Sequence, residues 1–243
     1  MLKRLFLLSL LAAAGLTACS GPGTNSAAHP ADDAAGASLA RLPYIGERDV
    51  RPRADGGPAD TVYATIPAFR LTDQAGQVLT NHTFAGRAYV ADFFFATCPG
   101  ICPKMQGELL KVYTKFAADP RVTFLSHTID PGHDNLPVLR DYAQRLGIAD
   151  ARRWHFATTG AHGEATAKDT VFQLARAYFT AAEPNKLAPG GYAHNGTLAL
   201  VDDQGHIRGV YDSLNPTEVA RLIEQLPVLL AEIDARKKGA AGR

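Results

Sequence analysis

The strongest constraint on the fold of this chain is a nearly continuous apolar run, residues 87–95, that leads directly into two cysteines. Residues 88–95 read Ala-Tyr-Val-Ala-Asp-Phe-Phe-Phe, and such a run is typical of a strand buried on both faces of a sheet. Cys98 and Cys102 follow, and Pro103 suits the first turn of a helix. Beyond it, apolar residues recur at spacings of three and four: Met105, Leu109, Val112, Tyr113 and Phe116. The sequence therefore predicts a strand, a cysteine-containing turn and a helix in succession.

The rest of the chain alternates segments typical of strands and helices. Expected strands span residues 63–72, 77–84, 122–128, 154–157, 197–201 and 207–211, and expected helices span 136–146, 164–179 and 216–233, the last with Asn215 as its N-cap. This order predicts an α/β protein with a thioredoxin-like fold. We expect a central mixed β-sheet flanked by helices, with an N-terminal strand extension and a C-terminal hairpin plus helix.

The N-terminus has the features of a secretory signal peptide. Lys3 and Arg4 precede an apolar stretch, residues 5–15, which is too short to span a bilayer of about 30 Å as a helix. Leu-Thr-Ala-Cys at 16–19 resembles the lipobox of bacterial lipoproteins, in which the cysteine is lipidated and becomes the new N-terminus. The alternative is that Cys19 is an incidental small residue in a leader cut elsewhere.

The lipobox leads to a prediction for the organisation and location of the chain. We expect a signal peptide at 1–18, a lipidated flexible tether at 19–41, a folded domain at 42–235 and a basic C-terminal tail at 236–243. Cys19 would anchor the protein to a membrane of the bacterial cell envelope. The domain would face the periplasm or another extracytoplasmic space.

Charge and cysteine content exclude several classes of protein. Lys and Arg number 25 against 24 Asp and Glu, so the chain lacks the charge of a basic nucleic-acid binder. Three cysteines are too few for a disulfide-rich scaffold or a four-cysteine zinc or iron–sulfur site. The absence of a Gly-x-Gly-x-x-Gly or phosphate-loop pattern disfavours a nucleotide-binding enzyme.

Cys98 and Cys102 are four residues apart at the expected helix N-terminus, where they share a helix face and where the helix dipole lowers a thiol pKa. A structural disulfide closing so short a loop would stabilise the fold weakly. A thiol–disulfide redox pair is chemically sound, although the familiar redox spacing has two intervening residues. A metal site needs a further ligand, and thiolates favour Cu(I) whereas imidazole suits either copper oxidation state. A peroxide reductase with Cys98 as the peroxidatic thiolate is disfavoured, because the Pro-x-x-x-Thr-x-x-Cys pattern is absent.

An ordered series of motifs resembles the Sco/SenC family of copper-binding proteins. The matching segments are 92–95, 98–103, 126–131, 134–137 with Leu139 and Tyr142, Trp154 with 159–160, and Ala-His-Asn at 193–195. The resemblance covers roughly residues 42–232, and a series of motifs in order is more specific than one cysteine pair.

The resemblance implies a metallochaperone that binds one copper ion, Cu(I) or Cu(II), through Cys98, Cys102 and His194. Its implied partners are the copper-site subunit of cytochrome c oxidase and a thiol reductant. An extracytoplasmic thiol–disulfide reductase remains the alternative, although no proline stands between 189 and 216, where redox thioredoxins carry a cis-proline. One departure is Ala193, which stands where many relatives have Asp before the histidine.

Other polar residues near the motifs have less specific interpretations. His127 and His133 flank Asp130 and are candidates for an auxiliary ligand or for loop and strand-end positions. Asp130 is either close to the site, as the resemblance implies, or a cap on the turn before the next helix. We expect the histidines without a surrounding motif to be surface residues: His29, His82, His155, His162 and His206.

Overall fold

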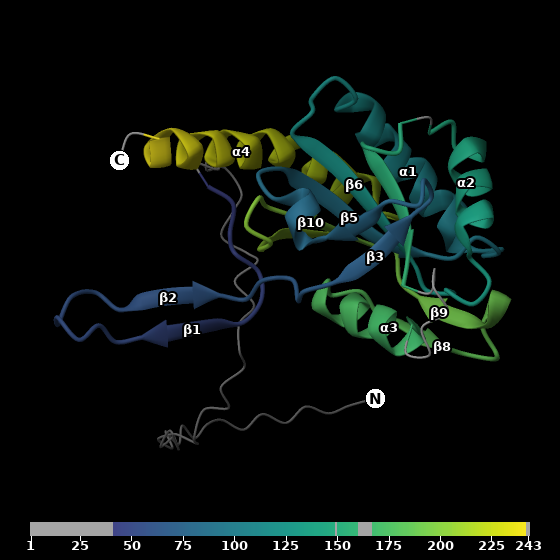
Figure 1. The fold of residues 1–243 in the computed structure, drawn as a ribbon, viewed down its shortest axis with the longest axis horizontal. Helices are drawn as coiled ribbons and strands as arrows, with labels where there is room; N and C mark the ends of the chain where they lie inside the picture. Colours follow the sequence, from purple (N-terminus) through teal and green to yellow (C-terminus); the bar gives the residue numbers. More distant parts are fainter. Residues whose placement is uncertain (1–40, 149, 160–166, 242–243) are drawn as a thin grey trace, which may run out of the picture. The chain divides into compact units, whose positions relative to one another are not determined.

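A mixed sheet of seven strands, in the order β11-β10-β5-β6-β7-β3-β4, forms the centre of the fold (Figure 1). The computed structural model describes residues 41–148, 150–159 and 167–241. The strands of this sheet are β3 (Arg70–Asp73), β4 (Val78–Thr80), β5 (Ala88–Phe94), β6 (Val122–Thr128), β7 (Trp154–Thr158), β10 (Thr197–Val201) and β11 (Ile207–Asp212). β5, β6 and β7 are parallel, and the other neighbours are antiparallel. The predicted mixed α/β architecture is confirmed.

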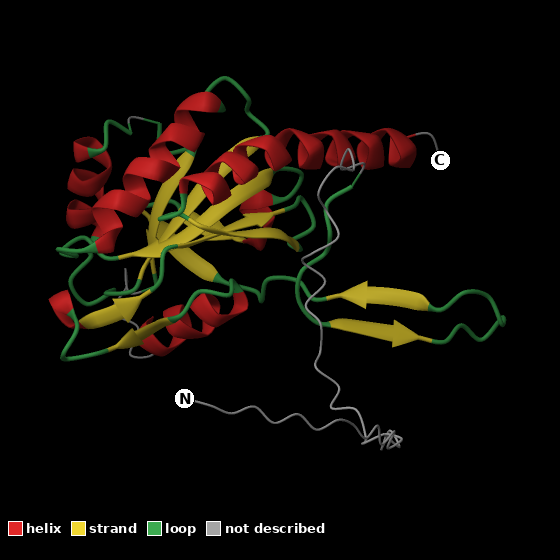
Figure 2. Cartoon of the chain, turned by 180° about the vertical axis from the view of Figure 1, so that it is seen from behind, coloured by secondary structure: helices red, strands yellow, loops and turns green. Residues whose placement is uncertain are grey.

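Helices cover both faces of this sheet (Figures 1 and 2). They are α1 (Ile101–Lys115), α2 (Leu136–Arg145), α3 (Ala167–Ala177) and α4 (Pro216–Ala241). Phe94 of β5 packs on Tyr142 of α2, and α1 and α4 contact each other on the same side. The next side chain, Phe93, points the other way and packs on Tyr178, just after α3. Every residue of β5 is therefore buried, as its apolar run predicts.

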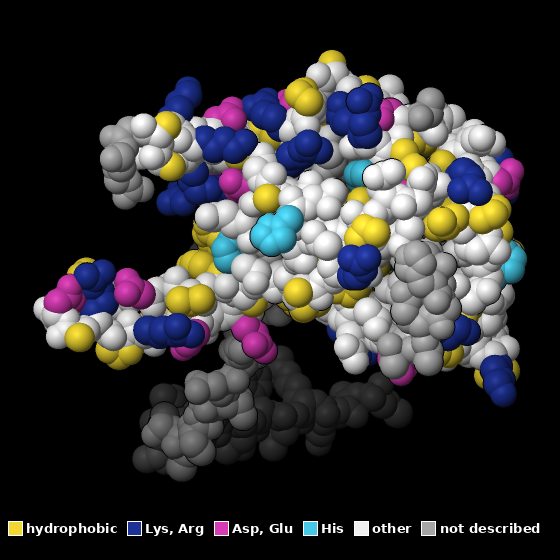
Figure 3. Space-filling model, in the orientation of Figure 1, with side chains coloured by type: hydrophobic (Ala, Val, Ile, Leu, Met, Phe, Trp, Pro, Cys, Tyr) yellow, Lys and Arg dark blue, Asp and Glu magenta, His cyan; other side chains and the backbone are white. Residues whose placement is uncertain are grey.

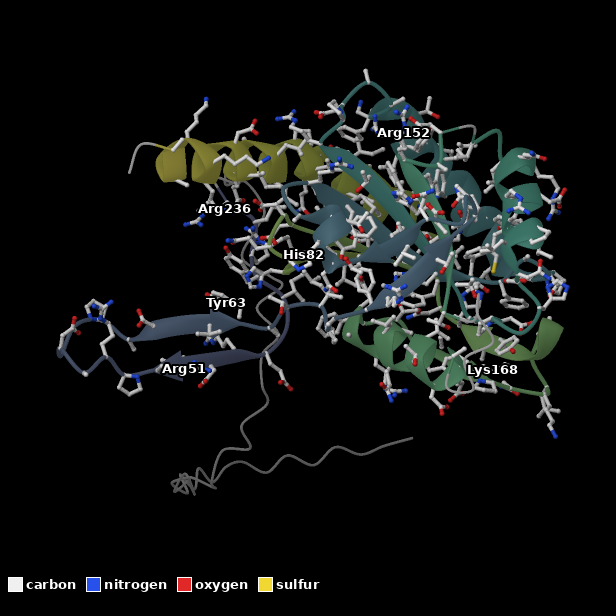
Figure 4. The ribbon with its side chains drawn as sticks, viewed as in Figure 1. Arg51, Tyr63, His82, Arg152, Lys168 and Arg236 are labelled. Carbon is white, nitrogen blue, oxygen red and sulfur yellow. The ribbon has the colours of Figure 1, made fainter. Side chains whose placement is uncertain are left out.

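The N-terminal strands differ from the prediction. The expected strand at 63–72 is two strands, β2 (Asp60–Tyr63) and β3, because Pro67 lies between them and cannot donate to a strand ladder. Within the described part of the chain, β2 pairs with β1 (Arg48–Arg51) alone. This hairpin carries mixed charged and apolar side chains (Figure 3), and Arg51 and Tyr63 lie on it (Figure 4).

The second expected strand is also shorter than predicted. It ends at Thr80 because Asn81–Phe84 forms a 3-10 helix. The Asn81 side chain accepts a hydrogen bond from the Phe69 N–H and donates to the Ile66 carbonyl. These bonds join the 3-10 helix to the segment before β3.

The C-terminal hairpin and helix are confirmed, with a longer helix than expected. The Asn215 side chain accepts a hydrogen bond from the Thr217 N–H at 3.0 Å, which is the predicted N-cap. α4 runs past Ile233 to Ala241, so residues 236–241 of the expected basic tail are helical. Arg236 in this extra length pairs with Asp203, which ties the end of the helix to the hairpin turn.

A buried ion cluster fixes the start of the described chain. Arg208, fully buried, donates to the carbonyl of Leu42 and pairs with Asp202 and Glu232. Glu232 in turn accepts from the Leu42 N–H at 2.6 Å. Residues 1–18, Cys19 and the tether as far as residue 40 lie outside the described residues. Within the described ranges, no helix is both long enough and apolar enough to cross a bilayer.

Two short strands that the sequence did not predict lie between α3 and β10. β8 (Ala182–Pro184) pairs antiparallel with β9 (Tyr192–His194), and a short 3-10 turn at Pro189–Gly191 precedes β9. The expected helix at 164–179 is described from Ala167 and ends at Ala177. This small sheet matters because His194 is its last residue.

Candidate metal centre

The junction between β5 and α1 positions both cysteines. Cys98 lies in the loop, where its N–H bonds to the Phe95 carbonyl at 3.1 Å. Asp134, fully buried, accepts from the Ala96 N–H at 2.9 Å and so fixes the same loop. Cys102 is the second residue of α1. Both thiols are free; Cys98 is half-buried and Cys102 is buried.

Burial changes the expected acidity of one of these thiols. The sequence predicts that a helix N-terminus lowers a cysteine pKa. In the structure, desolvation raises the pKa of Cys102 well above its ordinary value, and the neighbouring Cys98 raises it further. For Cys102 the expectation of a lowered pKa is therefore wrong, because burial outweighs the helix dipole. This thiol keeps its proton at neutral pH unless a metal ion displaces it.

His194, the last residue of β9, lies next to the two cysteines. Its Nε2 atom lies 3.1 Å from Cys102 Sγ and 4.0 Å from Cys98 Sγ. Its Nδ1 atom lies 3.1 Å from the Asn195 carbonyl oxygen, and a carbonyl only accepts, so Nδ1 carries the proton. Nε2 therefore turns a free lone pair towards the two sulfurs. Burial also lowers the pKa of His194, which keeps the imidazole neutral.

The three predicted ligand residues thus come together. Their ligand atoms all lie within 4.8 Å of one another, and within the described residues this is the one group of three or more Cys, His or acidic side chains that could hold a metal ion. Two thiols and a neutral imidazole are soft and borderline donors, suited to copper and poorly suited to Mg²⁺ or Ca²⁺.

Tyr192 anchors the strand that carries His194. Its hydroxyl donates to Asp130 at 2.9 Å and accepts from Lys168 at 3.0 Å. Lys168 is the second residue of α3 and is labelled in Figure 4. The Tyr192 ring also packs against Phe95, with ring centroids 5.3 Å apart. Asp130 therefore lies near the site and acts through the strand that bears the histidine.

Gly190 allows the segment before β9 to approach the cysteine loop. Its φ angle is 78°, a left-handed conformation that favours glycine. A Cβ atom there would lie 2.6 Å from the Phe95 ring and 3.4 Å from Pro99. The close approach places β9 directly beside the loop that contains Cys98.

A buried polar network next to the cysteines was missed by the sequence analysis. Asp92, in the middle of β5, accepts from the Ser126 hydroxyl at 2.5 Å and from the Gln106 amide at 2.6 Å. Trp154 donates to the same Ser126 oxygen. Burial raises the pKa of Asp92 to about 7. The sequence does carry a signal for this network, because an acidic residue inside a doubly buried strand must find polar partners.

The remaining histidines lie outside the metal group. His127 is buried in the core, where its ring stacks on Phe93 with centroids 4.5 Å apart. His133 bonds to Asp134. The expectation that His155 is a surface residue is wrong: it is buried on β7 and bonds to Asp73 at 2.9 Å. His82 is exposed and His206 is half-buried, whereas His29 and His162 lie outside the described residues.

Comparison with known proteins agrees with the geometry. The SCO1/SenC family model matches residues 58–228. A protein from Stutzerimonas stutzeri named as copper-binding is 28% identical over 148 residues, which is 59% of this chain and 67% of the relative. A SCO1 homologue from Bacillus subtilis is 22% identical over 168 residues, covering 69% of this chain and 83% of its own.

Solved structures of the family share the fold. A SCO1/SenC lipoprotein from Bacillus anthracis superposes with a TM-score of 0.60 at 22% identity, covering 68% of this chain and 94% of its own. BsSco, described as a member of the Sco family of cytochrome c oxidase assembly proteins, gives 0.56 at 21% identity, with coverage of 68% and 93%. Copper-bound ScoI from Arabidopsis thaliana gives 0.54 at 17% identity, with coverage of 68% and 99%. The thioredoxin-like fold is thereby confirmed, and the chain belongs to the SCO1/SenC family.

Proposed function

We propose that this protein is a copper metallochaperone that binds one copper ion through Cys98, Cys102 and His194. The observation that carries the proposal is the convergence of the three ligand atoms within 4.8 Å. The protonation of His194 supports it, because Nδ1 is occupied by the Asn195 carbonyl and Nε2 is left free to coordinate.

The donor set also suits release. Binding copper displaces the thiol protons of both cysteines, and three protein ligands leave the ion open to a further ligand from a partner. Transfer would proceed by ligand exchange, in which soft ligands of the acceptor replace these three one at a time. The half-exposed Cys98 is the sulfur that an acceptor reaches more readily than the buried Cys102.

The acceptor we propose is the copper site of cytochrome c oxidase. The description of BsSco as belonging to a family of oxidase assembly proteins supports this proposal, as does the copper bound in Arabidopsis ScoI. We further propose lipidation at Cys19, which would hold the protein on an envelope membrane beside a membrane-bound acceptor. In such an oxidising compartment a thiol reductant must keep the cysteine pair reduced.

A second function, thiol–disulfide reduction, is favoured by the unequal exposure of the two cysteines. The half-exposed Cys98 thiolate would attack a disulfide of the acceptor and release one acceptor thiol. The buried Cys102 would then attack Cys98 Sγ, and its proton would pass to the second acceptor sulfur, which leaves as a thiol. The acceptor gains two electrons, and the chain is left with a Cys98–Cys102 disulfide.

Copper titration of the reduced domain, residues 39–243, tests the proposal. We expect one tightly bound copper per chain, lost in both Cys98→Ser and Cys102→Ser because each removes a thiolate ligand. The reductase function predicts a different result, namely reduction of a disulfide-bonded acceptor peptide without copper. A folded, fully reduced domain that binds no copper but reduces the peptide would reject the chaperone in favour of the reductase.

A further inference from the structure

An open groove lies directly beside His194. Its volume is about 570 Å³, and its wall is formed by Ile101 of α1, the turn at residues 194–197 and residues 210–212 of β11. Phe179 and Leu214 complete it. His194 belongs both to this groove and to the metal group, so a molecule lying in the groove also reaches the metal ligands.

The groove exposes apolar side chains. Phe179 is 48% exposed and Leu214 is 45% exposed, and both are among the few large apolar side chains that the described chain leaves in solvent. Exposed apolar side chains gathered in one hollow are typical of a binding surface, whereas single ones are common on any protein. The groove is therefore suited to an apolar side chain of a partner.

The charge of the groove restricts that partner further. Among the described residues, Asp212 is the one acidic residue in the lining, and no Lys or Arg lines the groove. A neutral or basic segment is therefore favoured over an acidic one.

The part of the groove wall next to His194 is tightly packed. Gly196 cannot carry a side chain without displacing Ser213, because a Cβ atom there would lie 2.6 Å from Ser213 Oγ. The Ser213 hydroxyl is buried and has no hydrogen-bond partner within the described part of the chain. The turn that carries His194 is thus packed tightly against the Ser213 segment and gives the groove a fixed wall.

From these observations we propose that the groove binds an extended, non-acidic segment of the copper acceptor. An apolar side chain of that segment would lie between Phe179 and Leu214 while its thiol ligand reaches the copper held by Cys98. The inference rests on the proposed chaperone function and adds to it the surface that the acceptor uses. In the exchange step the acceptor sulfur forms a bond to Cu(I), the bond from Cys98 Sγ breaks, and the acceptor's thiol proton passes to Cys98. The copper stays Cu(I), so no oxidant or reductant is consumed.

The test compares copper transfer to three acceptors from the copper-loaded domain. The first is a ten-residue synthetic peptide with two cysteines and one methionine flanked by leucines. The second is the same peptide with serines in place of the leucines, and the third is a small Cu(I) chelator that is too small to use the groove. Leu214→Ser and Phe179→Asn remove the apolar contacts from two different segments. Asn is chosen because residue 179 has a φ of 57°, which Asn tolerates.

We expect each groove variant to slow transfer to the leucine peptide by about tenfold, as expected for losing one apolar contact. Transfer to the serine peptide and to the chelator should not change, and the copper spectrum should stay the same. Leu187→Ser is the matched control, because Leu187 is 96% exposed and lies outside the groove. Equal transfer rates to both peptides, or equal slowing for the peptide and the chelator, would overturn the inference while leaving copper binding intact. A parent domain that binds no copper would instead overturn the chaperone function itself.

Discussion

Two buried groups on adjacent strands should give this domain opposite dependences of stability on pH. Asp92 has its pKa raised from 3.8 to about 7, and His127 has its pKa lowered from 6.5 to about 4, in both cases mainly by burial. Between pH 3.8 and about 7, the folded state holds a proton on Asp92 that the unfolded state releases. Between about pH 4 and 6.5, the unfolded state holds a proton on His127 that the folded state lacks. The contribution of Asp92 is complete below pH 3.8 and is lost as the pH rises through 7, whereas that of His127 is complete above pH 6.5 and is lost as the pH falls through 4.

The magnitude follows from proton linkage. Each group changes the free energy of unfolding by about 1.4 kcal/mol per pH unit within its range. The shift of Asp92 therefore corresponds to about 4 kcal/mol, and that of His127 to about 3 kcal/mol. The two slopes have opposite signs between pH 4 and 6.5, so they largely cancel in the unaltered chain. Removing either group should make the pH dependence contributed by the other group measurable.

The perturbation is Asp92→Asn, which keeps the shape and can still accept from Ser126. The free energy of unfolding of this variant minus that of the unaltered domain should rise by about 4 kcal/mol from pH 4 to pH 7. The reason is that the variant lacks the contribution of Asp92, which falls as the pH rises. His127→Phe, which keeps the stacking on Phe93, should show the opposite trend and fall by about 3 kcal/mol from pH 4 to 6.5.

Urea unfolding of the reduced, metal-free domain at pH 4, 5, 6 and 7 measures both differences. Titration of the exposed carboxylates is common to all three proteins, so it cancels when each variant is compared with the unaltered domain. Differences that do not change with pH, or that change with the same sign in both variants, would refute the assignment of Asp92 as protonated and His127 as neutral.

Three further predictions concern the site. Tyr192→Phe removes two hydrogen bonds that hold β9, and it should weaken copper affinity about tenfold without changing the alkylation rate of Cys98; unchanged affinity in a competition titration would show that β9 is held by other contacts. Iodoacetamide should modify Cys98 faster than Cys102, because Cys102 is buried and its pKa is raised; peptide mapping by mass spectrometry measures this, and equal rates would contradict the burial. Gly190→Ala forces a Cβ atom against Phe95 and should lower both the melting temperature and the copper affinity, an expectation that a variant with unchanged melting and binding would reject.

The parts of the fold predicted from sequence were those in which local pattern and tertiary packing agree. The run at 88–95 is buried on both sides because helices cover both faces of β5. The cysteine turn, the helix after it and the Asn215 cap each follow from short-range chemistry. These features contain their own signals, so a single sequence reveals them.

The parts that were not predicted depend on contacts between distant segments. β8 and β9 are only three residues each, and next to them only glycine fits at position 190, because the Phe95 ring lies where a Cβ atom would be. The sequence could select His194 by resemblance, but its approach to Cys102 depends on the bonds of Tyr192 to two other elements. The raised pKa of Cys102 likewise results from burial, which no spacing of cysteines reveals.

The central claim is that His194 and the two cysteines act together as one copper site. The most direct test is the visible absorption of the reduced domain loaded with Cu(II), compared between the unaltered chain and His194→Ala. His82→Ala is the matched control, since His82 is exposed and outside the metal group. We predict a thiolate-to-copper band at one copper per chain that His194→Ala removes, with weaker copper binding in an intact fold, and that His82→Ala leaves unchanged. An identical band and affinity in His194→Ala would contradict the claim and assign the copper to the cysteines without the histidine.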